Sequence, residues 1–491
     1  MSSVLILVAI LAVGWLTWTL WGKVSPAKSL ACISLVEFDG DNSRDRYTRE
    51  AGSLLGKGYD EHIRNGRPFC IRDFLNPSRP RVFLPAKYIG ELRNATQEKL
   101  SLPGILNKTS TMSKAGGPEI TEEIQTSARV DLNRALNNLI EPMQSLYWTS
   151  VVLYPKMLEL FSHMSARVMV GPELCEAWPA ISMKYITRVL AAQGAIRKKY
   201  YPALYWTAYY LSPEVALVNE ARREAAKLVR PVLEARQAAY ATEGAKAEKH
   251  DDFIQWIMDN YRANGKTVTP DEAVQNIFIV MFASMHGTSF IALQSLFSLL
   301  GTPNALAEVR EEVERVSQNE LKGSPVWTCH ALGELKLMDS FMKETLRMKP
   351  FQKATVQRYA MTTYTFKDGL QVPAGTVISF PNLRYNTDSS TMSEASTFDG
   401  KRWLHRRFVP GMSKFQFAST TEDAFNWGAG PHACTGRFMA EVTIKLMLIC
   451  LIAKYDMKLS EEGPERPAEF KRFLDLAPDT SMAVTLRDVQ G

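Results

Sequence analysis

One cysteine near the C-terminus stands in a setting that favours chemistry. Cys434 lies within WGAGPHACTGR at 427–437, and the apolar sequence after it predicts a long helix that reaches about Tyr455. Unpaired N–H groups and the dipole at the start of a helix stabilise a thiolate. Glycines on both sides let the backbone lie close to a flat ligand, and His432 can reach a negative group beside the sulfur. A thiolate held in this way is a good soft ligand for iron.

A second candidate stretch interrupts the most apolar helix that the sequence predicts. TPDE at 269–272 is a strong start signal, with a capping Thr, Pro at the first helical position and Glu three residues after the cap. The apolar pattern then continues to Leu300, which gives a helix of about 46 Å. Its middle, SMHGTS at 284–289, is costly in a buried helix. The stretch predicts either a local opening that holds something polar or close packing against another helix.

A third candidate is a charged pair on a predicted helix that ends at Pro350. Glu344 and Arg347 lie three residues apart, so they share one face and can pair. Most pairs of this kind are solvated and contribute under about 1 kcal/mol. The pair has meaning only together with the other motifs.

The elements that must position these residues are mainly helical. Amphipathic patterns occur over 121–146, 180–200, 213–240 and 251–262. After Pro350, TYTF, KDG and LQVPAGTVIS predict a β-hairpin with Gly369 at its turn. The fold class expected is therefore mainly α with a small β region.

The first residues predict a membrane anchor. The stretch 4–21 has no charge, includes three tryptophans in its second half, and would form a helix of about 27 Å. Lys23 and Lys28 follow it, which places the body of the protein in the cytosol by the positive-inside tendency. A cleaved signal peptide is the alternative, but a charged segment before the apolar run is missing. We expect an anchor at 1–22, an approach segment at 23–59 and one domain over 60–491, since no linker or repeat divides the chain.

Composition narrows the function classes. The 491 residues include 58 basic and 52 acidic side chains, and the net charge of +6 is scattered. Nucleic-acid binding is therefore poorly supported. The six cysteines lie far apart without a compact pattern, which favours reduced thiols over a disulfide framework.

Taken together, these motifs resemble the cytochrome P450 family. The family's haem loop is Phe-x-x-Gly-x-Arg-x-Cys-x-Gly. Gly430, Cys434 and Gly436 match it, with Trp427 at the Phe place and His432 at the Arg place. The Glu344–Arg347 pair matches the family's Glu-x-x-Arg, and Arg402 in FDGKRW resembles the Arg that joins it. Arg358 falls where the family often places a second propionate-binding Arg, and the helix at 270–300 matches the one that crosses the distal face of the haem.

The resemblance implies a cytochrome P450 fold that holds haem b through the Cys434 thiolate. It implies a buried network of Glu344, Arg347 and Arg402 beneath the haem loop. It also implies a monooxygenase that receives electrons from NADPH through a separate reductase, with cytochrome b5 as a further candidate donor, because 491 residues leave no room for a flavin domain. The protein would be a single-pass protein of the endoplasmic reticulum membrane with a cytosolic catalytic domain.

The distal helix departs from the family pattern Ala/Gly-Gly-x-Asp/Glu-Thr-Thr. His286 stands at the acidic place, and Gly287 stands where the usual Thr would be, followed by Thr288. His286, Thr288 or a water could supply protons instead. A packed core histidine is the alternative for His286.

The substrate is expected to be a lipophilic small molecule of fungal secondary metabolism, with a terpenoid or meroterpenoid favoured. Two other functions stay open. The first is a haem-thiolate enzyme that catalyses desaturation, rearrangement or isomerisation without net oxygen insertion, which Gly287 favours. The second is a non-enzymatic membrane haem-binding protein.

Overall fold

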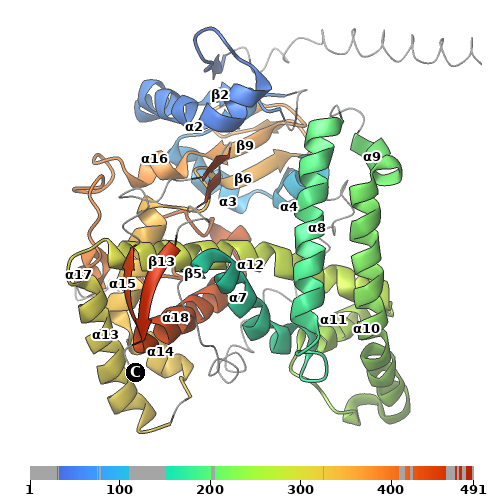
Figure 1. Cartoon of the computed structure of the whole chain (residues 1–491). Coiled ribbons are helices and arrows are strands. Elements are labelled where there is room, and N and C mark those ends of the chain that lie inside the picture. Colours follow the sequence, from blue (N-terminus) through green and yellow to red (C-terminus); the bar gives the residue numbers. More distant parts are fainter. Residues whose placement is uncertain are drawn as a thin grey trace, which may run out of the picture.

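The computed structural model describes residues 30–109, 151–459 and 470–488, with short gaps at 31, 75, 77–78, 201–204, 325, 408–414, 421–423, 473–474 and 478–482. The expected anchor at 4–21 and the amphipathic stretch at 121–146 lie outside the described residues. Most of the described chain is helical, and four groups of strands accompany the helices (Figure 1). This confirms the mainly α fold class with a small β region.

Helix α12 (Pro270–Leu300) crosses the middle of the molecule, and the other long helices pack around it (Figure 1). It begins where the sequence predicts, because Thr269 and Glu272 form a complete capping box. Its neighbours are α7 (Leu153–Val170), α8 (Trp178–Lys199), α10 (Pro213–Glu243), α11 (Phe253–Ala263), α15 (Lys336–Met348) and α18 (Arg437–Lys454). Among the described residues only α12 is apolar and long enough to span a membrane, and 67% of its apolar window is buried, as in a core helix.

Further α-helices complete the helical part. They are α2 (Arg44–Glu61), α3 (Ile89–Asn94), α4 (Leu102–Gly104), α9 (Tyr205–Leu211), α13 (Ala305–Val316), α14 (Cys329–Glu334), α16 (Asn382–Asn386) and α17 (Arg402–Arg407). Part of α2 falls in the expected approach segment, and its buried face packs against the largest sheet.

The largest sheet has six strands in the order β1-β2-β3-β9-β6-β4. Alternate residues of β2 enter two different apolar clusters, because successive side chains of a strand point to opposite faces. The strands are β1 (Ser34–Leu35), β2 (Phe69–Ile71), β3 (Arg81–Phe83), β9 (Val377–Phe380), β6 (Thr355–Ala360) and β4 (Leu100–Ser101).

Three smaller sheets complete the β structure. The hairpin predicted around Gly369 is confirmed as β7 (Tyr364–Thr365) and β8 (Gln371–Val372), with Gly369 at φ +87°. The others join β10 (Tyr455–Leu459), β13 (Ala483–Asp488) and β5 (Val151–Val152), and β11 (Phe470–Arg472) with β12 (Asp475–Ala477). The structure contains no disulfide between the six cysteines, all of which lie among the described residues.

Candidate active site

The middle of α12 opens on one side. Ala283 is exposed, and Ser284 and Gly287 are partly exposed, although the helix on either side is mostly buried. A Cβ placed on Gly287 would meet no atom within 4 Å among the described residues. The helix backbone continues unbroken through this stretch, and the Ser284 hydroxyl donates to the Val280 carbonyl at 2.7 Å. Of the two alternatives that the sequence leaves for this stretch, an opening is therefore present at Ala283 and Gly287.

His286 and Thr288 lie differently with respect to this opening. The Nδ1 atom of His286 is 2.7 Å from the hydroxyl oxygen of Tyr154 in α7. Burial lowers the pKa of His286, so the imidazole is neutral at pH 7. Thr288 is 4% exposed and stands about 140° around the helix from Ala283. The open side of α12 therefore belongs to Ala283 and Gly287, and Thr288 belongs to the packed side.

The loop before α18 brings Cys434 into place. Gly428 and Gly430 have φ values of +81° and +63°, which only glycine adopts without strain. The Cys434 N–H donates to the Trp427 carbonyl at 2.7 Å, and the Arg437 guanidinium donates to the Cys434 carbonyl at 2.8 Å. The loop is thus closed by its own backbone. The Cys434 side chain is exposed.

The thiol of Cys434 is less acidic than the sequence suggests. The protein around it raises its pKa by desolvation, while the backbone N–H groups of Gly436 and Arg437 and the Arg437 charge lower it only in part. The start of α18 therefore stabilises a thiolate, as predicted, but desolvation by the surrounding protein outweighs that effect on the pKa. A bound metal cation would supply the missing positive charge, since a coordinating thiol is deprotonated outright.

Beneath this loop lies a buried charge network centred on Glu344. The Glu344 carboxylate accepts from Arg347 at 2.7 and 2.9 Å and from Arg402 Nε at 3.2 Å. Glu344 and Arg347 are 0% and 1% exposed, so this pair is not of the solvated kind. Two further donors escaped the sequence reasoning, namely the indole N–H of Trp403 at 3.0 Å and the Asp399 N–H at 3.0 Å.

The network is tied to the cysteine loop by asparagine side chains. Arg347 donates to the Asn386 carbonyl at 2.6 Å, and the Asn386 amide donates to Asn426 Oδ1 at 3.1 Å. Asn382 donates to the same oxygen at 2.6 Å. Because Asn426 directly precedes Trp427, the helix that holds Glu344 also fixes the start of the loop.

Trp427 is held from a second side. Its indole N–H donates to the Phe417 carbonyl at 2.8 Å, and the two rings meet edge to face at 5.2 Å. The Phe417 N–H donates to Asp339 at 2.8 Å, and Asp339 pairs with Lys445 at 2.9 Å. Asp339 is therefore a structural support of the loop that no sequence motif indicated.

Arg358 is a buried arginine with unused donors. It is 1% exposed, and its Nη1 donates to the Gln357 carbonyl at 2.8 Å. Its Nε and Nη2 meet no partner among the described residues, and burial lowers its pKa to about 10. The pairing of β6 with β9 shifts between Thr355 and Arg358, and bulges of this kind re-aim side chains near sites. A buried guanidinium with free N–H groups is suited to an anion.

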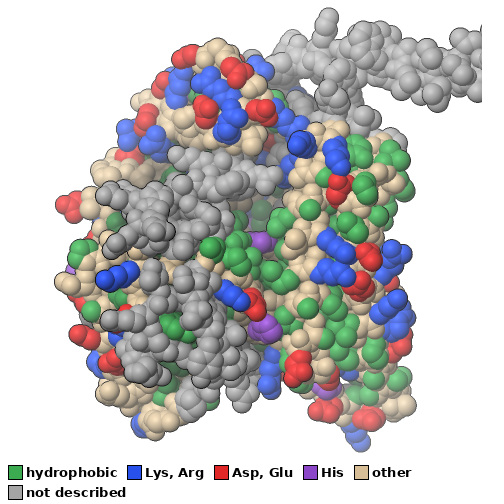
Figure 2. All heavy atoms as spheres, viewed as in Figure 1, with side chains coloured by type: hydrophobic (Ala, Val, Ile, Leu, Met, Phe, Trp, Pro, Cys, Tyr) green, Lys and Arg blue, Asp and Glu red, His purple; other side chains and the backbone are tan. Residues whose placement is uncertain are grey.

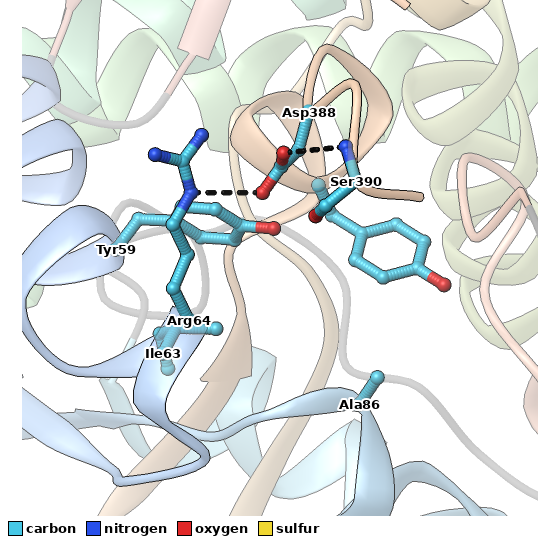
Figure 3. Close-up of a pocket in the computed structure, with 7 residues that line it drawn as sticks. Tyr59, Ile63, Arg64, Ala86, Asp388 and Ser390 are labelled. Atoms are coloured by element: carbon cyan, nitrogen blue, oxygen red, sulfur yellow. Dashed lines mark hydrogen bonds and ion pairs between the residues drawn. The ribbon is translucent and has the colours of Figure 1, made fainter. Parts of the chain in front are cut away.

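Two of the cavities among the described residues are separate from the open side of α12. One, of about 580 Å³, is lined by α2 and the segment after α16, where Arg64 and the Ser390 N–H both point at Asp388 (Figure 3). Burial favours protonation there, but these hydrogen bonds outweigh it and lower the pKa of Asp388 to about 2. The other, of about 390 Å³, lies against the cysteine loop at Gly428 and Gly430. Neither is lined by α12.

The fold and the site together define a mainly helical protein with a closed cysteine loop before α18 and a core helix, α12, that is open on one side. The family model for cytochrome P450 matches residues 132–483. The chain belongs to the cytochrome P450 family and is a haem-thiolate monooxygenase. Family membership implies haem b with a cysteine thiolate on the iron, and electrons from a redox partner.

Similar proteins come from fungi. The cytochrome P450 monooxygenase ccsG of Aspergillus clavatus is 32% identical over 515 residues, covering 100% of both chains. Pyrichalasin C-7 hydroxylase of Pyricularia grisea is 30% identical over 90% of each chain. Among solved structures, the retinoic acid-bound cyanobacterial CYP120A1 has a TM-score of 0.57 at 18% identity, covering 90% of this chain and 96% of that chain.

The residues present fit haem b. The exposed Cys434 sulfur offers the iron ligand, and the unused Arg358 donors suit a propionate. His432, in the short turn Gly430–His432 just before Cys434, is partly exposed and offers a second propionate partner. The open face at Ala283 and Gly287 leaves room for a flat group against α12.

Gly430→Ala is expected to impair haem incorporation. Alanine in the left-handed region costs about 1–2 kcal/mol, and its Cβ would also lie 1.9 Å from Cγ of Arg93, which must move. The haem-to-protein ratio and the urea midpoint measure the effect. Gly333→Ala in α14 is the matched control, because its new Cβ meets nothing within 4 Å. Equal haem content and stability in the two variants would contradict this view of the loop.

Proposed function

We propose that this chain is a membrane-bound monooxygenase of fungal secondary metabolism that hydroxylates or further oxidises a lipophilic small molecule, with Cys434 as the iron ligand. Three features together carry the proposal. They are an exposed cysteine in a closed loop, a buried Arg358 with N–H groups that have no partner among the described residues, and an open face in the middle of α12. Haem b, when bound there, supplies the activation of dioxygen.

Each residue group has a separate task. Cys434 binds the iron, while His432 and Arg358 bind the propionates. Glu344, Arg347 and Arg402 keep the loop that carries Cys434 in position, because a satisfied buried network resists movement. Trp427, Gly430 and Gly436 shape the loop so that the cofactor can approach its backbone.

The distal side combines an aromatic wall with one imidazole. Phe290 stacks on Tyr154 at 4.9 Å and meets Phe351 at 5.5 Å. A group of aromatic rings of this kind would suit an apolar substrate. We assign proton supply to His286, which is neutral and lies in this wall. Thr288 is a second candidate, although its side chain lies on the packed side of the helix.

The substrate class rests on the sequence pattern and on the relatives. A terpenoid or meroterpenoid is the class that the sequence favours. The name of the pyrichalasin hydroxylase adds pyrichalasin-type compounds to the substrates to be tested, and supports hydroxylation as the reaction. The empty space at Gly287 favours a second candidate, a rearrangement or desaturation without net oxygen insertion, because the usual hydroxyl is missing there.

Membrane attachment and electron supply complete the proposal. Large exposed hydrophobic side chains gather over α8, α9 and the start of α10, and Figure 2 shows hydrophobic groups at this end of the molecule. They are Leu190, Tyr209, Tyr210, Leu211 and Leu217. This patch supports contact with the endoplasmic reticulum membrane beside the anchor at 1–22. NADPH–cytochrome P450 reductase would supply electrons there, with cytochrome b5 as a further donor.

Gly287→Thr is expected to leave haem binding intact and to change coupling. A Cβ fits at this position without a clash, and the new hydroxyl would face the open side of α12. Peroxide released per NADPH, measured with added reductase, is expected to differ from the unmutated enzyme. Gly194→Thr in α8 is the control, because its Cβ also meets open space. An unchanged peroxide ratio in Gly287→Thr would show that the missing Thr has no consequence.

Microsomes that contain this chain and a reductase test the proposal directly. They are incubated with NADPH, ¹⁸O₂ and a panel of terpenoid, meroterpenoid and pyrichalasin-type compounds. A product that carries one ¹⁸O atom, formed only with NADPH and reductase, supports monooxygenation. A product that is isomerised or desaturated without ¹⁸O supports the second candidate and contradicts the first.

A further inference from the structure

The hydroxyl of Tyr154 and the imidazole of His286 join two helices that are far apart in sequence. Tyr154 is the second residue of α7, and His286 lies at the centre of α12. Tyr154 Oη and His286 Nδ1 are 2.7 Å apart, a short hydrogen bond. The rings of Phe282 and Phe290 lie 6.1 and 6.2 Å from the imidazole. The hydrogen bond between Tyr154 and His286 therefore lies among aromatic rings.

Both partners are neutral, so the hydrogen bond joins two uncharged groups. Burial raises the pKa of the Tyr154 phenol and lowers the pKa of the His286 imidazole. Neither residue has a charged hydrogen-bonding partner among the described residues, and His286 Nε2 is buried with no partner there. The position of the proton between the two groups is thus set by their own donors and acceptors.

The relative strengths of the two groups decide the direction of this bond. Either direction leaves one donor and one acceptor without a partner, so a count of unmet groups does not distinguish them. A phenol O–H is a stronger acid than a neutral imidazole N–H, and the imidazole lone pair is a stronger base than a phenol oxygen. The arrangement in which the phenol donates to Nδ1 is therefore favoured, and it places the imidazole proton on Nε2.

We propose that Tyr154 is a positioning residue for His286, which it holds as the Nε2–H tautomer with that N–H directed away from α7. The Nε2–H of His286 is then a hydrogen-bond donor that is available to an acceptor on the distal side of the haem. This inference rests on the proposed role of His286 in proton supply. It adds a residue from α7 that lies outside every motif of the site.

The chain contains a matched control for removing the phenol oxygen. Tyr185 in α8 stacks on Phe278 of the same helix α12 at 3.8 Å, and its buried hydroxyl has no partner among the described residues. Tyr154→Phe and Tyr185→Phe therefore remove the same atom from two rings that pack on α12. Only the first removes a hydrogen bond to His286.

The experiment uses carbon monoxide as a probe, because the frequency of its stretching band on reduced haem responds to nearby hydrogen-bond donors. The band is recorded by infrared spectroscopy in the full-length reduced protein and in Tyr154→Phe, Tyr185→Phe and His286→Gln. A shift is expected in Tyr154→Phe and His286→Gln, and none in Tyr185→Phe. A shift in His286→Gln with none in Tyr154→Phe overturns the inference and leaves the role of His286 standing. No shift in His286→Gln overturns both.

A second measurement does not depend on the Tyr154→Phe variant and therefore tests the inference even if that variant does not fold. Nitrogen NMR of the unmutated, histidine-labelled protein in the reduced carbon monoxide complex reports which imidazole nitrogen carries the proton, with His286→Gln assigning the signal. A protonated Nε2 and a hydrogen-bonded, unprotonated Nδ1 support the inference. A protonated Nδ1 contradicts it.

Discussion

A Cys434→Ala variant is expected to lose the red-shifted carbon monoxide spectrum and all monooxygenase activity. The methyl group of alanine cannot bind iron, and the thiolate is the ligand that favours O–O cleavage. The loop itself should persist, because the hydrogen bond to the Trp427 carbonyl uses the backbone N–H of residue 434. Difference spectra of the reduced protein and turnover with reductase measure the two effects.

The control for this variant is Cys450→Ala. Cys450 lies in α18, the helix that follows the loop, and its side chain is partly buried against the main core. The spectrum and activity of Cys450→Ala are expected to match the unmutated protein. Retention of either property by Cys434→Ala would remove Cys434 from the site.

Glu344→Gln is expected to lower the free energy of unfolding by about 3–5 kcal/mol, the usual cost of breaking a buried ion pair. The substitution leaves the guanidinium groups of Arg347 and Arg402 beside a neutral amide. This is costly because Arg347 is 1% exposed, so water cannot compensate its charge. Loosening this network should also reduce haem retention, because Asn386 and Asn426 connect it to the loop. Urea unfolding and the haem-to-protein ratio report the two effects.

Glu159→Gln is the matched control, because Lys156 and Glu159 form a pair of similar spacing at 41% and 47% exposure. A loss under about 1 kcal/mol is expected there. Losses of equal size in the two variants would mean that the Glu344 network is not a special support of the loop.

The pH dependence of stability provides an independent check on Glu344. Burial alone would raise the pKa of this carboxyl, but Arg347, the Asp399 N–H and Arg402 outweigh burial and hold the pKa below its usual value of 4.5. A carboxyl with a lowered folded-state pKa adds stability above that usual value and loses it as the pH falls toward the folded-state pKa. The unmutated protein should therefore lose more stability in this acid range than Glu344→Gln.

Local sequence signals predicted the elements of the fold well. The capping residues Thr269 and Glu272 fix the start of α12, and Gly369 fixes the hairpin, because each acts within a few residues. The joining of Arg402 to Glu344 and Arg347 was predicted by the family resemblance rather than by spacing. The structure contains these contacts.

Contacts between distant segments could not be predicted in this way. Asp339 reaches Phe417 across 78 positions, and Tyr154 reaches His286 across 132. Neither spacing has a pattern that one sequence can reveal, because the contact exists only after the helices pack. Trp403 had one usable signal, its place beside Arg402. The thiol of Cys434 illustrates a different limit, since local backbone donors favour the thiolate while desolvation by the surrounding protein opposes it.

The carbon monoxide difference spectrum of the reduced, full-length protein in microsomes tests the central claim most directly. The account predicts a strongly red-shifted Soret band, the signature of haem bound by the Cys434 thiolate. A band at the position of histidine-ligated haem in freshly prepared folded protein, or no haem signal at all, would contradict it.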